Sequence, residues 1–369
     1  MKKIAILSID GGGIRGIMPA AILVRLESII QELTGQPDLK IGDMFDLVAG
    51  TSTGGILSCI YLAPGEPKKA KFSAQQALDL YVDHGHEIFD RTLWQRVGTI
   101  DGIFGAKFSN KALDAQLTKY FGDLKLADLI KPSLITSYEM TQRRAVFFTS
   151  ADARDDAGSN FLVRDVARAT SAAPTYFPPA GIQSTEGADY SLLDGGVFAN
   201  NPALCAYSEA LKLDFRTLFP DCDKAQPRGA RDMLIISLGT GSVKKRYRIE
   251  DFRQAGEIKW LEPIIDILMS GNSETVDYEL KSIYSTLGAP DNADYYRLEP
   301  QLVRAVSDMD CATPENIENL KSDGLAFAEN NRALLREIAQ KIVNHCIAPM
   351  SAAPASASST APAPAAIPA

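Results

Sequence analysis

Two apolar runs that end in glycine-rich turns constrain the fold of this chain most. The first, KIAILSI at residues 3–9, is almost continuously apolar and is followed by DGGG, which suits a strand buried on both faces of a sheet. The second, MFDLVAG at residues 44–50, predicts another strand, and TGGILSCIYL after it predicts a helix. Both turns therefore connect a buried strand to a helix.

The rest of the chain continues this alternation of strands and helices. Apolar residues from Ile22 to Leu33 recur at helical spacing, with Pro19 in the first turn and Gly35 at the end. Further strands are predicted in PSLITSYEM, AVFFTS and MLIISLGTG, and further helices in VRDVARATSA and PALCAYSEALKL. We expect Asn201 to cap the last helix, with Pro202 at its first position. The pattern predicts an α/β fold with a mostly parallel sheet covered on both faces.

Domain organisation follows from length and composition. The 369 residues are 46% hydrophobic and 23% charged, which is typical of a globular chain. Beyond Arg246 the pattern is mainly helical to Val343, and we expect this extension to pack on the same domain. The last residues are almost entirely Ala, Pro and Ser, so they cannot bury enough apolar surface to offset the entropy of ordering. We predict one domain at 3–346 and a disordered tail at 347–369.

Charge and cysteine content limit the partners and the compartment. The net charge of −8 gives no general attraction to nucleic acid, so we expect no nucleic-acid partner. Five cysteines without a C-x-x-C motif favour reduced thiols. The first apolar run is too short for a secretion signal, and we see no membrane span, so we expect a cytoplasmic protein, with export by a non-Sec route left open.

The second turn carries a serine between two glycines. In GTSTG, Gly50 and Gly54 flank Ser52 at −2 and +2, the pattern of a nucleophile elbow when a strand precedes it and a helix follows. The serine of such an elbow sits in a strained conformation, and glycines remove the clash between neighbouring Cβ atoms. The alternative is a glycine-rich turn with an incidental serine.

A base for this serine is hard to find among the histidines. His84 and His86 lie two residues apart and therefore point to different faces of a helix, and His345 borders the tail. Asp194 ends a short apolar run and precedes Gly195 and Gly196, which would let the backbone approach a neighbouring element closely. An ordinary Asp-Gly turn is the alternative, but the shortage of histidine favours Asp194 as a carboxylate base.

The first turn, DGGGIRG, admits two interpretations. Gly11, Gly13 and Gly16 fit the G-x-G-x-x-G dinucleotide pattern, but Asp10 would place a carboxylate beside the pyrophosphate, and the next strand lacks a ribose-binding acid. The other interpretation is an oxyanion hole, because small residues at a helix N-terminus expose backbone N–H donors.

Five stretches together resemble the patatin-like phospholipase family, over about Lys3 to Val343. They are LSIDGGGIRGIMPAAIL, GTSTGG, SAAPTYFPP, LLDGGVFANNP and ISLGTG, in the order found in the family. The resemblance implies a three-layer α/β/α sandwich and lipid acyl hydrolase activity through a Ser-Asp dyad of Ser52 and Asp194, without metal or organic cofactor. It also implies that Gly11, Gly12 and Gly13 form the oxyanion hole. Arg15 fills the basic position of the first motif, and its role stays open.

The expected reaction is ester hydrolysis through an acyl-enzyme, with Thr53 supplying a further oxyanion donor. The substrate would be a phospholipid or another acyl lipid, met at a membrane or micelle surface. Apolar residues of a loop-rich stretch could line an acyl site or simply pack in the core: Leu93, Trp94, Ile103, Phe104 and Phe108. Two other functions stay open: a phospholipase effector switched by a ligand or partner, and a catalytically silent storage or interaction protein on this fold.

The histidines provide a first test of these assignments. His84→Ala and His86→Ala should each keep turnover within about tenfold of the parent, a change of ~1.4 kcal/mol or less in barrier, because neither histidine is expected to move the proton. Steady-state ester hydrolysis measures this. A folded variant that loses several orders of magnitude would restore a histidine triad.

Overall fold

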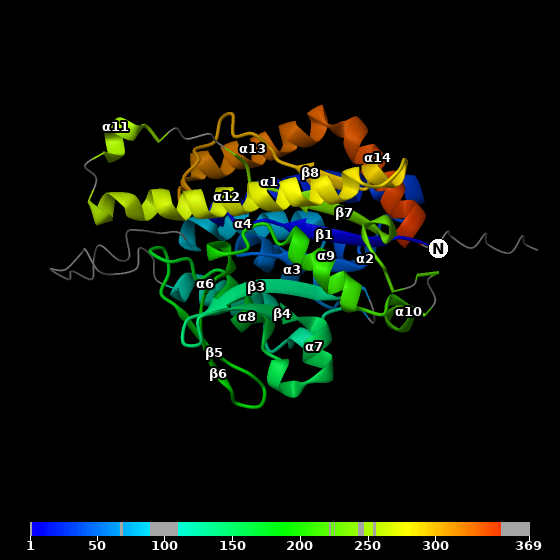
Figure 1. The fold of residues 1–369 in the computed structure, drawn as a ribbon, viewed down its shortest axis with the longest axis horizontal. Coiled ribbons are helices and arrows are strands. Elements are labelled where there is room, and N and C mark those ends of the chain that lie inside the picture. The colour runs from blue at the N-terminus through cyan, green and yellow to red at the C-terminus, as the bar shows by residue number, and fades with distance from the viewer. Residues whose placement is uncertain are drawn as a thin grey trace, which may run out of the picture.

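One eight-stranded sheet lies between two layers of helices in the computed structural model, which describes residues 2–66, 69–88, 110–220, 223–224, 226–242, 247–253 and 256–347 (Figure 1). The strands are β1 (Ile4–Ile9), β2 (Leu47–Gly50), β3 (Ser133–Glu139), β4 (Arg144–Thr149), β5 (Ala180–Gln183), β6 (Asp189–Asp194), β7 (Met233–Leu238) and β8 (Tyr295–Leu298). The helices are α1 (Ile17–Thr34), α2 (Ile41–Met44), α3 (Thr53–Leu62), α4 (Ala74–Ile88), α6 (Lys111–Phe121), α7 (Ser150–Asp155), α8 (Val163–Thr170), α9 (Ala203–Lys212), α10 (Phe215–Leu218), α11 (Ile249–Phe252), α12 (Glu257–Ser285), α13 (Pro314–Asn330) and α14 (Arg332–Cys346).

The strand order is β5-β6-β3-β2-β1-β7-β8, with β4 also paired to β3. Five neighbouring strands are mutually parallel: β3, β2, β1, β7 and β8. Antiparallel pairs join β4 and β6 to β3, and β5 to β6. The prediction of a mostly parallel sheet in a three-layer α/β/α sandwich is therefore confirmed, with an antiparallel region at one side.

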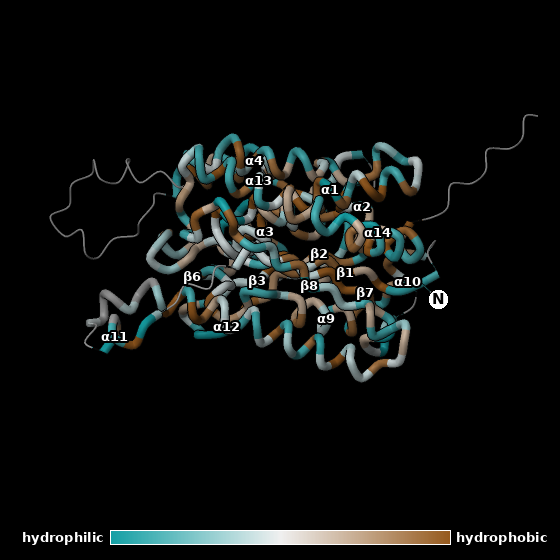
Figure 2. The backbone as a smooth tube through the Cα atoms, turned by 90° about the horizontal axis from the view of Figure 1, so that it is seen from above, coloured by the Kyte–Doolittle hydropathy of each residue, from teal (hydrophilic) through white to brown (hydrophobic). Residues whose placement is uncertain are grey.

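Both faces of the sheet are covered, which explains the continuous apolar runs. Along β1, Leu7 and Ile9 face a core shared with helices that include α1, α3, α4 and α14, whereas Ile4 and Ile6 face a second core shared with α9 and α12. Figure 2 shows these two layers on opposite sides of the strands. A strand that is buried on both faces has no polar side to alternate with.

The register along β3 brings two strand ends together. β4 occupies one edge of β3 over Leu134–Glu139, so β2 and β6 share the other edge. Gly50 at the end of β2 pairs with Ile135, and Asp194 at the end of β6 pairs with Ser137. Because β2 is parallel and β6 antiparallel to β3, their ends point toward each other, about 7 Å apart along β3. The fold therefore places the turn after Gly50 next to Asp194.

Two local predictions need correction, and one is confirmed with an addition. The segment beyond Arg246 is mainly helical, as predicted, but it also contributes β8, which pairs in parallel with β7 and completes the sheet; the YYRL sequence of β8 is short and partly polar. The second strand begins at Leu47, since Ile41–Met44 forms α2. The N-cap of α9 is Pro202, although the Asn201 side chain still accepts the Ala203 N–H at 3.0 Å.

The tail at 348–369 and the stretch at 89–109, with its five apolar residues, lie outside the described residues, so the tail and the role of that stretch stay predictions. None of the helices that the structure describes is long and apolar enough to cross a membrane.

Glu27 of α1 is a buried carboxylate that joins two other helices. It accepts the N–H of Ile41 at the start of α2 at 2.9 Å and the N–H of Ala74 at the start of α4 at 3.1 Å. The first N–H groups of a helix have no partner within the helix, so the carboxylate satisfies both ends and favours both helix dipoles. Glu27 thereby fixes where α4 begins.

Glu27→Ala should lower the free energy of unfolding by about 2–4 kcal/mol, because it leaves two buried N–H groups without an acceptor. Urea denaturation measures this. Glu32→Ala, at an exposed position of the same helix, is the matched control and should change stability by about 0.5 kcal/mol or less. Equal losses in the two variants would contradict the bridging role.

Candidate active site

Ser52 sits at the strained turn between β2 and α3. Its backbone has φ 54° and ψ −122°, a conformation that non-glycine residues rarely adopt. The Ser52 N–H donates to Thr170 Oγ1 at 2.9 Å, and its side chain lies at the wall of a pocket with only 7% of the residue exposed. The predicted strand–turn–helix geometry around the serine is confirmed.

The glycines around this turn are required by close approach. A Cβ on Gly50 would lie 2.2 Å from the carbonyl oxygen of Gly54, and one on Gly54 would lie 2.1 Å from that of Ile9. Real Cβ atoms essentially never make such short contacts, so a side chain at Gly50 would force the serine turn open, and one at Gly54 would push the turn away from the end of β1. Gly16 has a similar role, because its Cβ would meet Thr53 Oγ1 at 2.1 Å.

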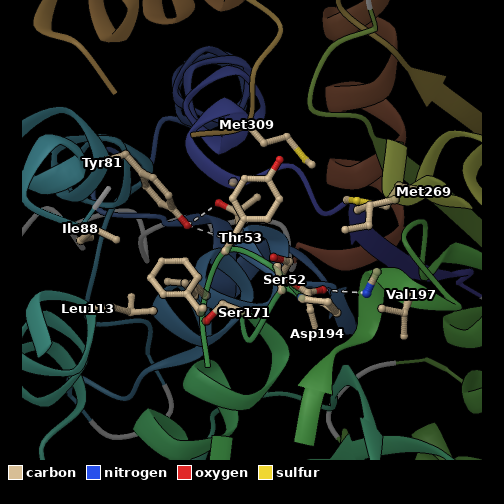
Figure 3. A pocket seen from close by; sticks show the side chains of 18 of the residues that line it. Ser52, Thr53, Tyr81, Ile88, Leu113, Ser171, Asp194, Val197, Met269 and Met309 are labelled. Atoms are coloured by element: carbon tan, nitrogen blue, oxygen red, sulfur yellow. Dashed lines mark hydrogen bonds between the residues drawn. The ribbon is translucent and has the colours of Figure 1, made fainter. Parts of the chain in front are cut away.

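Asp194 ends β6 and lies beside Ser52 in the same pocket (Figure 3). It is 3% exposed, and its Oδ1 accepts the Gly196 N–H at 2.7 Å. Burial raises the pKa of the Asp194 carboxyl to about 7, although hydrogen bonds from the Ser52 hydroxyl and the Gly196 amide lower it. Gly195 permits this turn, because a Cβ there would lie 2.6 Å from the Thr136 carbonyl oxygen.

The first glycine loop passes next to the serine turn. Gly13, with φ 60°, lines the same pocket as Ser52 and Thr53. Within the described part of the chain, the N–H groups of Gly12, Gly13 and Thr53 have no protein acceptor. The Gly11 N–H, in contrast, donates to the Asn200 carbonyl at 3.1 Å. The expectation that all three glycines offer an available donor is therefore corrected: Gly11 does not.

Arg15 belongs to this loop but not to the pocket that contains Ser52. Its Nη1 donates to the Gly241 carbonyl at 3.2 Å and its Nε to the Gly12 carbonyl at 3.4 Å. It lines a separate polar pocket with Asp10 and Arg297. The role that the sequence left open is therefore a backbone contact that ties the glycine loop to the loop after β7.

The pocket that contains Ser52 and Asp194 is lined almost entirely by apolar side chains. They come from α3, α4, α6, α12, the segment after α8 and a loop before α13, and include Ile56, Leu80, Ile88, Leu113, Leu117, Phe177, Ile265, Leu268, Met269 and Met309. Tyr81 from α4 closes one wall and holds the start of α3, because its hydroxyl accepts from Thr53 Oγ1 at 2.6 Å. Such a lining suits a long apolar group that ends at Ser52.

None of the chain's three histidines lines this pocket, and all three lie in described ranges. His84 lies near Glu87 on α4, and the Nδ1 of His345 accepts the Lys3 N–H at 3.2 Å. Among the described residues, no three His, Cys, Asp or Glu side chains are grouped to bind a metal ion.

Several residues of the site are not predictable from the sequence. The stretch SAAPTYFPP carried a resemblance but no role, and the structure places Ser171, Pro174 and Phe177 from it in the pocket wall. Thr170, just before it, is the acceptor for Ser52 N–H. No local pattern points to Ile265, Leu268 and Met269, because a long amphipathic helix does not indicate what its apolar side covers.

The raised pKa of Asp194 predicts how the free energy of unfolding changes with pH. The folded chain holds this proton more tightly than the unfolded chain, in which the pKa is near its ordinary value of 3.8. The folded state therefore loses stability as the pH rises from about 4 to about 7. Asp194→Asn should remove this loss, so the variant should gain stability over the parent with rising pH, on the order of a few kcal/mol above pH 7.

Chemical denaturation of both proteins at several pH values measures this difference. Ser52→Ala is the matched control, because it keeps the carboxyl and removes only a hydrogen bond that lowers its pKa, so its stability should still fall with rising pH, at least as far as that of the parent. A stability difference between Asp194→Asn and parent that does not change with pH would contradict a raised pKa.

Comparison with known proteins agrees with this geometry. The family model of the Patatin-like phospholipase matches residues 7–207. Patatin-like protein 2 of Oryza sativa subsp. indica is 34% identical over 90% of this chain and 85% of its own length, and Patatin-like protein 1 of Arabidopsis thaliana is 33% identical over 89% and 82%. The crystal structure of VipD from Legionella pneumophila aligns with 11% identity and a TM-score of 0.40 over 94% of this chain and 67% of that chain, too low a likeness to support a conclusion. The chain belongs to the patatin-like phospholipase family, and this membership supports lipid acyl hydrolase activity in general.

Proposed function

We propose that this protein hydrolyses acyl esters of lipids through an acyl-enzyme on Ser52, with Asp194 as the only side-chain base. The observation that carries this proposal is the buried pair itself. A serine on a strained elbow lies beside a carboxyl whose pKa is raised to about 7, in an apolar pocket without histidine. A carboxylate with such a pKa is a stronger base than an exposed one and is still partly ionised at neutral pH.

In the first half-reaction, Asp194 accepts the proton of the Ser52 hydroxyl as its Oγ attacks the ester carbonyl carbon. The tetrahedral intermediate collapses, the bond to the alcohol breaks, and Asp194 returns the proton to the leaving oxygen. In the second half-reaction, Asp194 takes a proton from water, whose oxygen attacks the acyl-enzyme, and Ser52 leaves with that proton. The carboxyl thus returns to its ionised form after each cycle.

The negative charge that develops on the carbonyl oxygen needs fixed donors. We assign this role to the N–H groups of Gly12, Gly13 and Thr53. Gly13 and Thr53 line the pocket, and Gly12 precedes Gly13 in the glycine loop. These three N–H groups have no acceptor within the described part of the protein. Thr53 is the first residue of α3, so the dipole of this helix also favours an anion there.

The surroundings of the pair favour an acyl lipid as substrate, and the match to the Patatin-like phospholipase family favours a phospholipid within that class. The apolar lining accepts a fatty acyl chain, and the side of the pocket formed by α12 continues onto the surface. Leu268 lines the pocket and is 51% exposed, and Ile264 and Ile267 beside it are also exposed. We infer that this part of α12 meets the membrane or micelle surface from which the chain is drawn.

Ser52→Ala should abolish release of fatty acid from mixed phospholipid vesicles, because the acyl-enzyme can no longer form. The fold should persist, since only a hydroxyl is lost and the Ser52 backbone contact to Thr170 remains. Fatty-acid release and circular dichroism measure these outcomes. A folded variant that keeps more than about 1% of parental release would remove Ser52 as nucleophile.

Asp194→Asn should slow labelling of Ser52 by a fluorophosphonate by about 100-fold or more, the usual scale for loss of a general base. The amide keeps the shape of the side chain but cannot accept the proton. Asp189→Asn, at the exposed start of the same strand, makes the same chemical change and should label at the parental rate. Parental labelling of Asp194→Asn would leave Asp194 as a turn residue only.

A further inference from the structure

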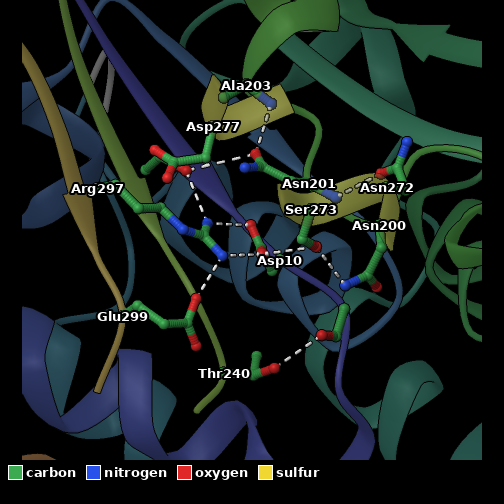
Figure 4. A network of polar contacts seen from close by, with 12 residues as sticks. Asp10, Asn200, Asn201, Ala203, Thr240, Asn272, Ser273, Asp277, Arg297 and Glu299 are labelled. Atoms are coloured by element: carbon green, nitrogen blue, oxygen red, sulfur yellow. Dashed lines mark hydrogen bonds and ion pairs between the residues drawn. The ribbon is translucent and has the colours of Figure 1, made fainter. Parts of the chain in front are cut away.

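A buried ion pair next to the glycine loop lines the polar pocket that also contains Arg15 (Figure 4). Asp10, the residue before Gly11, binds Arg297 through two parallel hydrogen bonds: Arg297 Nη1 to Asp10 Oδ1 at 2.9 Å and Nη2 to Oδ2 at 2.7 Å. The side chains of Asp10 and Arg297 are only 3% and 9% exposed. Two-point binding of this kind fixes the direction of a carboxylate as well as its distance.

The sheet determines where this arginine lies. Arg297 is on β8, and β8 pairs in parallel with β7, so that Arg297 is opposite Ser237. Arg297 Nη1 also donates to Ser237 Oγ at 2.9 Å, and Glu299 forms an ion pair with the same guanidinium. Three neighbouring strands, β1, β7 and β8, are thereby tied together at the end of the sheet that carries the glycine loop.

The Asp10 carboxylate that Arg297 orients also belongs to a ring of contacts around the glycine loop. Ser273 of α12 donates to Asp10 Oδ2 at 3.3 Å, and Asn200 Nδ2 donates to Ser273 Oγ at 3.0 Å. The Asn200 carbonyl in turn accepts the Gly11 N–H at 3.1 Å. Asn200 lies in the segment that follows Asp194, so one ring joins the glycine loop, the loop of the base and α12.

This ring restrains the backbone of the glycine loop, which has no side chains of its own to do so. Gly11, Gly12 and Gly13 have no side chains with which to pack, and glycine has the widest backbone freedom of any residue. The direction of the Gly12 and Gly13 N–H groups must therefore be imposed by their neighbours. A buried ion pair by itself is weak evidence for stability, because desolvation of the two charges offsets much of their attraction. Its geometric effect on the loop is the better explanation for its presence.

We propose that Arg297 is a positioning residue for the reaction, which through Asp10 holds the Gly12 and Gly13 N–H groups toward the developing oxyanion at Ser52. The inference rests on the proposed function, because it assigns a task within that mechanism. It also adds a residue from beyond the stretch 7–207 that the family model matches. Arg297 touches neither Ser52 nor Asp194 and acts only through the loop.

The test uses two variants and one control in the full-length chain. Arg297→Lys keeps the positive charge but loses the two-point contact. Asp10→Asn with Arg297→Gln and Glu299→Gln neutralises the three charges together, so that neither carboxylate is left without the arginine that it pairs with. The control is Asp46→Asn. Asp46 is buried, forms an ion pair with Lys224 and accepts the Ala5 N–H at 2.8 Å, so it bonds the first half of the same strand, β1, away from the glycine loop.

The readouts are kcat and KM on a soluble short-chain ester, the pH profile of kcat/KM, and hydrogen exchange of the peptide around Gly11. Both Arg297 variants should lower kcat by about tenfold or more with KM within about threefold, because a displaced oxyanion hole stabilises the transition state less. The acidic limb of the pH profile should stay in place, since Asp194 is unchanged. Exchange at the glycine loop should become faster, and Arg297→Lys should be the less impaired variant.

The control separates positioning from general destabilisation. Asp46→Asn should lower the melting temperature but keep kcat within about threefold of the parent. Arg297 variants with parental kcat, or an Asp46→Asn variant with an equal loss of kcat, would overturn the inference. Failure of the proposed function would look different, because the parent itself would then neither hydrolyse the ester nor react with a fluorophosphonate.

Discussion

One edge of β3 carries two strand ends that run toward each other, and the whole candidate site depends on this register. β2 occupies the first half of the edge and β6 the second, so the serine turn and the carboxylate arrive from opposite directions. Side chains alternate across a sheet, and a slip of one residue in β6 would turn Asp194 to the other face. The burial of Leu192 in the core opposes such a slip, because a shift by one residue would expose this side chain and bring the exposed Ser191 into its place. The pairing register of β6 that packs the core is therefore also the register that places Asp194 beside Ser52.

The apolar pocket has two effects that reinforce each other. Its lining suits a fatty acyl chain, and burial at the same place raises the pKa of Asp194 into the range in which a carboxylate is an effective base. In a polar pocket the carboxyl would stay ionised but would be a weak base. This arrangement lowers the stability of the folded state at neutral pH, because ionisation of a buried carboxyl is unfavourable. The backbone N–H groups of the glycine loop carry no such cost, because they do not ionise. They only have to be held in one direction.

Local features of the site were predictable from the sequence, whereas most of its long-range contacts were not. The strand–serine turn–helix unit and the Asp194 turn could be predicted because glycines at fixed offsets report a local steric need. Chemistry favours Asp194 as the base, because the chain has only three histidines and none of them suits this role. The β8 strand was missed because four residues of YYRL carry too little periodicity. The pairing of Arg297 with Asp10, the contact of Gly11 N–H with Asn200 and the α12 wall depend on tertiary packing, which leaves no local pattern.

The central claim is that a buried carboxyl, and no histidine, moves the proton of Ser52. The pH dependence of kcat/KM on a soluble ester tests this claim most directly, because it reports the ionisation of the essential base in the unliganded enzyme. The account predicts one acidic limb with an apparent pKa of about 7, as given by the burial of Asp194, and the same limb in a variant that lacks both His84 and His86. A limb near the ordinary pKa of an aspartate, or one that disappears with the two histidines, would contradict it.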